Sequence, residues 1–357
     1  MYYEIAKTKF NKLVKNYKKI DIIILAIETS CDETSIAVVK NGNEVLSNIV
    51  SSQIEIHARF GGVVPEVASR NHLLALNSVL KEAINKAKIT FKDISVVAVT
   101  YGAGLVGSLM VGVSFAKALA FSLNIPLIAV NHINAHISAN YITNSNLTPP
   151  FLSLVVSGGH TALIKVTKNK KILIGTTHDD AIGEAYDKVA KVLGLEYPGG
   201  PVIDKLSYKG KANIKFIKKP REKNNFNFSY SGLKTAVINY LHKLKQAKTE
   251  PVIEDVCASF QKEAVEEVVE KSILACKKFK LNVLAVAGGV AANSYLRKRL
   301  NEEGKNNNIK IVIPPIDLCT DNAAMVDGEA YQNIIQGVGL ANLSLTAQAS
   351  INLKYTK

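Results

Sequence analysis

The sequence has few of the residues and patterns that mark secreted, disulfide-bonded or membrane-spanning proteins. It contains four cysteines, Cys31, Cys257, Cys276 and Cys319, and no two of them have the C-x-x-C spacing of a redox motif or zinc knuckle. Neither a disulfide framework nor a cysteine zinc site is therefore expected, and the chain is predicted to be reduced and cytoplasmic. No apolar run is expected to reach the roughly 18 residues that a membrane-spanning helix needs.

The first twenty residues are basic but lack the features of a targeting segment. They hold six lysines and Glu4, without an apolar core, arginine or serine. Neither a secretory signal nor a mitochondrial presequence is expected. Residues 1–21 are predicted to form a basic extension that is unstructured or weakly helical.

Arginine is scarce, although the formal net charge is +14. The charge comes almost wholly from lysine, and a lysine-rich background is by itself a modest argument for nucleic-acid binding. A local cluster is a better candidate, and it comprises Lys209, Lys211, Lys215, Lys218, Lys219, Arg221 and Lys223, opposed by Glu222. The cluster is either a solvated loop or a surface that contacts a phosphate backbone, and the sequence favours neither interpretation.

The length of 357 residues and the hydrophobic content of 47% indicate a substantial core in two domains or in one large domain. Apolar runs separated by turn residues predict the same order of three strands twice. These strands are 22–27, 35–39 and 44–50 in the first half, and 151–156, 162–167 and 171–176 in the second. We expect a first half at 22–145, completed by 322–357, and a second half with helical insertions at 146–321.

Each half also contains an apolar strand that leads into a glycine-rich turn and a helix. Strand 96–100 precedes the turn 102–107, and strand 283–287 precedes the turn 288–293. Free N–H groups and the helix dipole make such a turn a predicted anion site. The predicted fold class is α/β, with two similar halves and a cleft between them for a phosphate-bearing ligand. This pattern resembles the actin-like ATPase fold of sugar kinases and chaperone ATPases, although fold alone does not determine function.

Two histidines stand four residues apart, at His132 and His136, within the segment 130–137. If the segment is helical, as its apolar positions indicate, both imidazoles project from one face and could bind one divalent metal. A chance pair on a helix surface is the alternative, and it is the commoner one for a bare H-x-x-x-H. Asp321, after a predicted strand at 310–313, is either a third ligand or, like Asn322, a helix N-cap.

A polar turn, Ser157-Gly158-Gly159-His160-Thr161, interrupts two predicted strands just after the histidine helix. Glycines at such a bend let the backbone approach a ligand closely, and their N–H groups can hold phosphate or carboxylate oxygens. Most turns of this kind are plain hairpin turns, so the motif alone is a weak signal.

The chain resembles the tRNA threonylcarbamoyladenosine transferase family, the TsaD proteins, once misnamed O-sialoglycoprotein endopeptidases. The matching segments follow in order over nearly everything after residue 21, and they are 27–34, 57–66, 130–137, 156–161, 183–188, 197–201, 231–235 and 319–322. The chain departs from the family pattern at Ala103 and Ala291, where proline and glycine are usual, and at Tyr230 within the usual F-S-G-L-K.

The resemblance implies a reaction and a set of binding partners. The threonylcarbamoyl group of threonylcarbamoyl-adenylate would pass to the exocyclic amine of the adenosine 3′ of the anticodon, in tRNAs reading A-starting codons, and AMP would leave. Bacterial family members generally need a paralogous dimer partner and a small ATPase, so both are expected partners, and no membrane is expected.

The resemblance also implies the site residues. His132, His136 and Asp321 would hold one divalent metal per subunit, with iron favoured and zinc as the alternative. The donor-binding residues would be Val155, Val156, Ser157, Gly158, Gly159, Asp187, Gly200, Asp204 and Asn293. Two imidazoles and one carboxylate suit either metal, and carboxylates such as Asp187 and Asp204 suit ribose hydroxyls.

Asp32 and Glu33 are candidates for orienting or deprotonating the incoming amine. The alternative for each is a polar turn that hydrogen-bonds to itself. For Asp187 the alternative is an exposed helix position paired with Lys191.

Three other functions are rivals to this interpretation, and one is a non-catalytic scaffold of a tRNA-modifying complex, although degenerate relatives of that kind lose the metal residues that this chain keeps. A metallopeptidase of the zincin type needs H-E-x-x-H, whereas Ile133, Asn134 and Ala135 separate the two histidines here. An ATP-binding kinase or ATPase of the same fold is compatible with the glycine turns, but magnesium prefers carboxylates and water to histidines.

Overall fold

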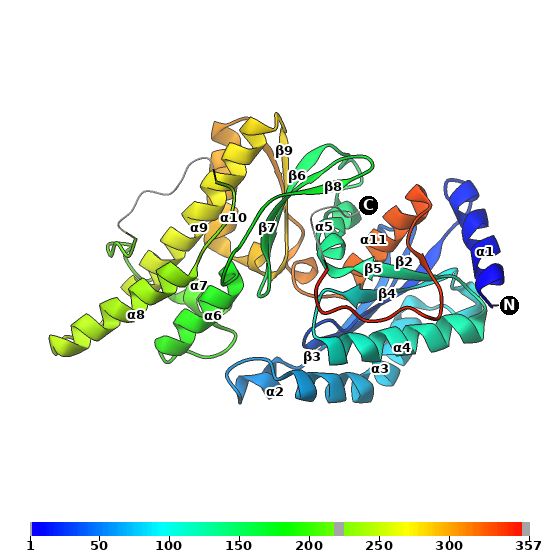
Figure 1. The fold of residues 1–357 in the computed structure, drawn as a ribbon, viewed down its shortest axis with the longest axis horizontal. Coiled ribbons are helices and arrows are strands. Elements are labelled where there is room, and N and C mark those ends of the chain that lie inside the picture. The colour runs from blue at the N-terminus through cyan, green and yellow to red at the C-terminus, as the bar shows by residue number, and fades with distance from the viewer. Residues whose placement is uncertain (1, 218–224, 352–357) are drawn as a thin grey trace. The chain divides into compact units, whose positions relative to one another are not determined.

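The computed structural model describes residues 2–217 and 225–351 and divides the chain into two compact units. The first comprises Met1–Leu147 and Asp321–Asn352, and the second comprises Thr148–Thr320. Each is an α/β unit built on one mixed sheet (Figure 1).

The first unit has a six-stranded sheet in the order β11-β5-β4-β1-β2-β3. Strands β1 (Ile23–Glu28), β2 (Glu33–Lys40) and β3 (Glu44–Ser52) form an antiparallel meander. Strands β4 (Val96–Gly102) and β5 (Leu127–Asn131) continue the sheet parallel to β1, and β11 (Leu340–Ala341) closes it. The carboxyl ends of β1, β4 and β5 therefore meet at one edge of the sheet.

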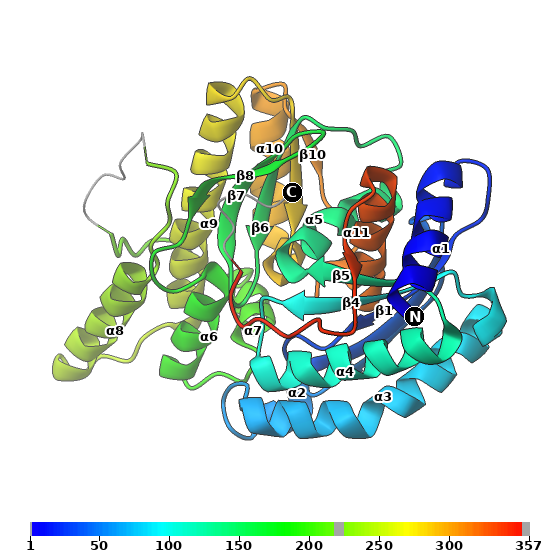
Figure 2. The ribbon, with the colours of Figure 1, turned by 45° about the vertical axis from the view of Figure 1, so that its right-hand side comes forward.

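Helices cover both faces of this sheet (Figure 2). Helices α3 (Pro65–Ala87) and α4 (Val106–Leu123) pack against strands of one face. Helices α5 (His132–Thr143) and α11 (Ala323–Gln336) pack against one another and lie over the other face. The short α2 (Ile54–Ala58) and a 3₁₀ turn at Phe91–Asp93 precede α3 and β4 respectively.

The second unit repeats the topology of the first with a five-stranded sheet in the order β10-β9-β6-β7-β8. Strands β6 (Phe151–Val156), β7 (Thr161–Val166) and β8 (Lys171–Thr176) form a meander, and β9 (Val283–Ala287) runs parallel to β6 beside β10 (Lys310–Val312). The helices are α6 (Ile182–Val192), α7 (Gly199–Ser207), α8 (Ser231–Gln246), α9 (Ile253–Lys278) and α10 (Ser294–Asn306). Short 3₁₀ turns occupy Gly289–Ala292 and Ile316–Leu318.

The basic N-terminal segment is more ordered than the sequence indicates. It forms helix α1 (Tyr2–Asn16), which packs on α11 and buries Tyr2, Ala6, Phe10 and Leu13. Because these residues are spaced four, four and three apart, they form one apolar stripe along the helix.

Helix α4 corrects the expectation that no segment is long and apolar enough to span a membrane. Its 18 residues have a mean hydropathy of 1.7. Length and composition alone are weak evidence, because core helices of other proteins meet the same criterion. In the first unit α4 packs against β4 and α3, and Gly112 meets the Thr29 side chain.

Candidate active site

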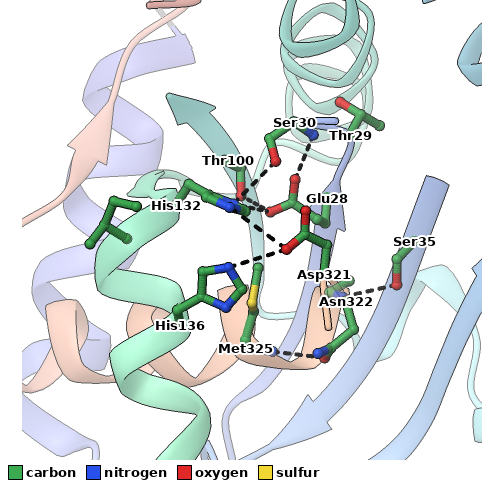
Figure 3. Close-up of polar contacts among 12 residues, drawn as sticks. Glu28, Thr29, Ser30, Ser35, Thr100, His132, His136, Asp321, Asn322 and Met325 are labelled. Carbon is green, nitrogen blue, oxygen red and sulfur yellow. Dashed lines mark hydrogen bonds and ion pairs between the residues drawn. The ribbon is translucent and has the colours of Figure 1, made fainter. Parts of the chain in front are cut away.

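The two predicted histidines lie together at the start of α5 (Figure 3). The Asn131 side chain caps the helix, accepting hydrogen bonds from the N–H groups of Ile133 and Asn134 at 2.9 and 3.2 Å. Helix α5 therefore begins at His132, directly after β5, and His136 follows one turn later on the same face. The ring centroids of the two histidines are 4.6 Å apart, and both side chains are buried.

Asp321 completes a group of three potential metal ligands. The Nε2 atoms of His136 and His132 lie 3.1 and 3.7 Å from Oδ1 of Asp321, and one ligand atom from each residue lies within 4.8 Å of the others. Asn322 is the residue that caps α11, accepting from the N–H of Met325 at 3.2 Å. Of the two roles that the sequence left open for Asp321, the geometry therefore favours the ligand over the N-cap.

The donor set fits a divalent transition metal. Both ring nitrogens of His136 are buried without a hydrogen bond within the described structure, and Nε2 has only the ion-pair contact with Asp321. A buried imidazole nitrogen without such a bond carries a cost that a metal–nitrogen bond would remove. Two imidazoles and one carboxylate leave coordination positions open for a substrate.

Glu28, which the sequence prediction omitted from the site, lies behind His132. Its Oε2 is 3.3 Å from Nδ1 of His132 and accepts a hydrogen bond from Thr100 at 2.6 Å, while Oε1 accepts from the N–H of Ser30 at 2.5 Å. A carboxylate at Nδ1 favours the tautomer whose Nε2 lone pair faces the metal position. The sequence feature that could have identified Glu28 is its position as a single acidic residue at the end of an apolar strand.

Glu28 and His132 stabilise each other's charge. Burial opposes ionisation of Glu28, but the neighbouring His132 and the Thr100 hydroxyl outweigh it and lower the pKa of the carboxyl. Burial likewise opposes a charged His132, whereas Asp321 and Glu28 outweigh it and raise the pKa of the imidazole to about 9. A metal at Nε2 would compete with that proton.

Asp32 and Glu33 lie in the same unit, where the β1–β2 turn enters β2. Asp32 is buried, and Ser52 donates a hydrogen bond to Glu33 at 3.3 Å. Burial, followed by the charges of Asp321 and Asp32, raises the pKa of Glu33 to about 10. Carboxyl groups this close share a negative potential that a bound cation would offset.

His72 holds both sides of the turn that carries these two carboxyl groups. Its Nε2 lies 3.0 Å from the carbonyl oxygen of Cys31, and its Nδ1 lies 2.7 Å from the Thr34 hydroxyl. Because a carbonyl only accepts, Nε2 carries the proton and Nδ1 accepts from Thr34. Burial lowers the pKa of His72 and favours this neutral form. The sequence prediction did not include His72.

The predicted donor-binding residues all lie in the second unit. Val155 and Val156 end β6, and Ser157–His160 form the turn to β7, in which His160 N–H donates to the Ser157 hydroxyl at 3.1 Å. The segment is thus a hairpin turn, which was one of the two interpretations. A Cβ atom at Gly158 or Gly159 would meet nothing within 4 Å, so open space adjoins this backbone.

Helix α6 packs tightly against that turn. The N–H of Gly183 donates to the Ser157 carbonyl at 3.2 Å, and a Cβ at Gly183 would lie 2.6 Å from that oxygen. One turn further, Asp187 accepts a hydrogen bond from the N–H of Gly199 at 2.8 Å. Asp187 therefore supports the start of α7, while a Cβ at the adjacent Gly200 would meet nothing within 4 Å.

Asp204 and Asn293 are brought together at the start of α10. Asp204 accepts from the Ser294 N–H and hydroxyl at 3.0 and 2.8 Å. Asn293 accepts from the Leu296 N–H at 2.8 Å and donates to Gln261 at 2.8 Å. The N–H groups of Ser294 and Leu296 thus bond to protein side chains, so the anion site expected at this helix start is occupied by Asp204.

The glycine turn of the first unit is also not a vacant anion site. The N–H of Gly104 donates to the Ala349 carbonyl at 3.0 Å, and the N–H of Leu105 donates to the Ser30 carbonyl at 2.8 Å. A Cβ at Gly104 would lie 2.5 Å from the Ser30 oxygen. Gly104 therefore allows the backbone of the turn to pack closely against Ser30. The sequence prediction had attributed the glycines of this turn to phosphate binding instead.

The predicted basic cluster is only partly described. Lys209, Lys211 and Lys215 are exposed, and the Lys211 N–H donates to Asp255 at 2.7 Å. The remaining members, Lys218, Lys219, Arg221, Glu222 and Lys223, lie outside the described residues.

Comparison with known proteins identifies a match over most of the chain. The sequence model of the TsaD family, tRNA N6-adenosine threonylcarbamoyltransferase, matches residues 44–328. A protein of that name from Clostridium perfringens is 54% identical over 333 residues, which cover 93% of this chain and 98% of the relative. Another from Clostridioides difficile is 53% identical over 319 residues, covering 89% of this chain and 94% of the relative.

Solved structures with similar folds share little sequence identity with the chain. HypF from T. kodakarensis has a TM-score of 0.60 at 14% identity, over 88% of this chain and 48% of HypF. Component A of the Acidaminococcus fermentans (R)-2-hydroxyglutaryl-CoA dehydratase has a TM-score of 0.52 at 15% identity, over 88% of this chain and 99% of that protein. These likenesses confirm the predicted actin-like ATPase fold class.

Proposed function

The chain belongs to the tRNA N6-adenosine threonylcarbamoyltransferase family, and we propose from this membership a reaction and its participants. Threonylcarbamoyl-adenylate donates its threonylcarbamoyl group to N6 of the adenosine 3′ of the anticodon, in tRNAs that read A-starting codons. The observation that carries the proposal is 54% identity over 98% of a relative, together with the convergence of His132, His136 and Asp321.

The reaction forms one bond and breaks another. The N6 amine attacks the carbamoyl carbon, the bond from that carbon to the phosphate oxygen breaks, AMP leaves with the electron pair, and the amine loses a proton. A divalent ion held by His132, His136 and Asp321 would supply Lewis-acid stabilisation of the phosphate charge. We propose iron as this ion and zinc as the alternative, because both accept two imidazoles and one carboxylate.

Asp32 and Glu33 are proposed to handle the incoming amine. The raised pKa of Glu33, to about 10, favours its protonated form, and a protonated carboxyl donates a hydrogen bond rather than removing a proton. We therefore assign deprotonation of the amine to Asp32 and orientation of substrate to Glu33. His72 positions both groups, because it bonds to the residues on either side of them.

The donor is proposed to bind the predicted residues of the second unit. Gly158, Gly159 and Gly200 adjoin open space, which supports a close approach of a ligand to their backbone. Asp187 and Asp204 are proposed to accept bonds from ribose hydroxyls, with Val155, Val156, Ser157 and Asn293 forming the rest of the contact.

Neither alternative enzyme function is supported by a specific observation. The residues between the histidines, Ile133, Asn134 and Ala135, are apolar or amide side chains, so they offer no general base for peptide hydrolysis. The metal group contains two histidines, which are not typical ligands of magnesium in ATPases.

We also propose that the protein acts in the cytoplasm with a paralogous dimer partner and a small ATPase. The four cysteines are free, which is typical of a reducing compartment. Leu73 and Leu74 of α3 and Met110 of α4 are exposed apolar side chains on two helices that contact each other, and this exposed apolar surface supports a protein partner.

One experiment tests the central proposal. Purified chain is analysed for bound metals and then incubated with threonylcarbamoyl-adenylate and tRNA, with and without candidate partners. Mass spectrometry of the nucleosides is expected to detect threonylcarbamoyladenosine and one metal ion per subunit. Absence of the modified nucleoside under all of these conditions would contradict the proposal.

A further inference from the structure

Helix α1 is anchored to the first unit along one side. Its Tyr2 hydroxyl donates to the Ile125 carbonyl at 2.8 Å, and the Tyr2 ring lies 5.8 Å from that of Phe121. Phe10 is 3% exposed and Ala6 is fully buried. Because the apolar stripe is buried in the protein, the orientation of the helix is determined by packing, and so is the side that faces solvent.

The solvent side of α1 and the turn after it are almost uniformly positive. Six lysines are exposed there, and they are Lys7, Lys9, Lys12, Lys15, Lys18 and Lys19. The only carboxylate of the helix is Glu4, and within residues 2–217 and 225–351 none of these six lysines forms an ion pair. We call these six residues the α1 lysine face.

We propose that the α1 lysine face binds the phosphate backbone of tRNA, an inference that rests on the proposed function. Unpaired lysines held on a fixed helix attract a polyanion and release its counterions. The nine residues from Lys7 to Lys15 make eight steps of about 1.5 Å along the helix, or about 12 Å, so the face can contact successive phosphates. Helix α1 lies outside residues 44–328, which the family model matches.

The buried stripe argues for a nucleic acid rather than a lipid surface. An amphipathic helix binds a membrane by inserting its apolar face among the lipids. In α1 that face is already packed on the protein, and the outer apolar residues Tyr3 and Ile5 are only 37% and 38% exposed. Lysines without insertable apolar side chains favour phosphates in an aqueous setting.

The face lies far from the candidate metal site within the same unit. Tyr2 bonds to Ile125, before β5, whereas His132 follows the other end of that strand. The seven residue steps from Ile125 to His132 span about 23 Å if the chain is extended. The face therefore contacts tRNA away from the reacting adenosine, and it contributes to binding of tRNA rather than to the chemical step.

The test replaces Lys7, Lys12 and Lys15 by glutamine together in the full chain. We expect the KM for tRNA to rise about 10-fold at physiological salt, with kcat unchanged at saturating tRNA. The slope of log Kd for tRNA against log salt should fall by roughly two to three, about one for each phosphate contact. Replacement of the same residues by arginine should retain wild-type binding, because the charge is retained.

A matched control replaces Lys81, Lys86 and Lys92, which are exposed on and just after α3. These changes remove the same charge and should leave the KM for tRNA within about twofold. Equal losses in both triple variants, or no loss in the α1 variant, would overturn the proposal. Charge-dependent binding to vesicles with anionic lipid, without an effect on tRNA, would assign the face to a membrane instead.

Failure of this inference is distinguishable from failure of the proposed function. If wild-type protein forms no threonylcarbamoyladenosine, the proposed function fails, whatever the α1 variants do. If wild-type protein modifies tRNA and the lysine-to-glutamine variant binds and modifies it equally well, only the inference about α1 fails.

Discussion

The Nδ1 atom of His132 lies 3.3 Å from Oε2 of Glu28, so a buried carboxylate supports the imidazole whose other nitrogen faces Asp321. This arrangement orients the ring, and when a metal displaces the proton on Nε2 the carboxylate keeps the remaining proton on Nδ1. Replacing Glu28 by glutamine should weaken metal affinity about 10- to 100-fold, because the amide is a poorer acceptor for the ring N–H. Competition with a chelator, measured on the purified chain, checks this directly. Unchanged affinity would show that Glu28 does not support the ligand.

Removal of the metal ligands should abolish transfer. A His132→Ala change removes one ligand and leaves the buried Glu28 without its imidazole partner, so circular dichroism must accompany the assay. An Asp321→Asn change keeps the side-chain shape and provides a second variant. Both are expected to lose the metal and the formation of threonylcarbamoyladenosine. Full activity in a metal-free His132→Ala, Asp321→Ala double variant would rule out the proposed role of the metal.

Gly158 and Gly183 of the second unit provide a variant and a control for donor binding at the turn after β6. A Cβ at Gly158 would meet nothing within 4 Å, whereas a Cβ at Gly183 would lie 2.6 Å from the Ser157 carbonyl. Gly183→Ala should therefore destabilise the fold by about 1–3 kcal/mol through overpacking. Gly158→Ala should leave the free energy of unfolding unchanged and weaken donor binding, because the methyl group fills the space proposed for the donor. Urea denaturation and donor KM separate the two effects, and equal donor KM in Gly158→Ala and wild type would argue against donor binding at this turn.

The raised pKa of Glu33 predicts a pH dependence of stability in metal-free protein. Between the ordinary pKa of a glutamate and about 10, the folded state keeps a proton that the unfolded state has released. The unfolded state then binds fewer protons, so the free energy of unfolding falls as pH rises through this interval. Glu33→Gln removes the titration and should flatten the dependence. Urea denaturation from pH 5 to 9 measures it, and parallel curves for variant and wild type would contradict the assignment.

His72 is expected to act as a positioning residue. His72→Ala leaves the Cys31 carbonyl and the Thr34 hydroxyl without their bonds to the ring, which should cost about 1–3 kcal/mol of stability. It should also lower kcat more than it raises the KM for either substrate, since the Asp32–Glu33 turn loses its support. Retention of kcat in a variant that is folded at the assay temperature would refute the positioning role.

Much of the fold was predictable because it depends on local patterns. Strand-length apolar runs and turn residues indicated the two meanders, and both are present as β1–β3 and β6–β8. The N-terminal segment was less predictable, because its helicity depends on the burial of Tyr2 and Phe10 against the first unit. The expectation that no segment is long and apolar enough to span a membrane was wrong for α4. Glycine and serine interrupt the apolar residues of this 18-residue helix, so it does not stand out as a continuous apolar run.

The phosphate sites were the least predictable feature. A strand, a glycine turn and a helix start indicate free N–H groups, but only the folded chain shows what those groups bond to. Ala349 and Ser30 accept from the turn after β4, and Asp204 accepts from the start of α10. None of these acceptors is near its donor in the sequence, so no local pattern could reveal them.

The sequence by itself indicated a helix at 130–137 from its apolar positions, and the four-residue spacing of His132 and His136 places both rings on one face of such a helix. It also determined the family, because the ordered motifs can be recognised from the sequence alone. Only the tertiary structure decided that Glu28, 104 residues from His132, supports that ring, and that Asn322 rather than Asp321 caps α11. Long-range contacts of this kind depend on how strands and helices pack, and no local periodicity encodes them.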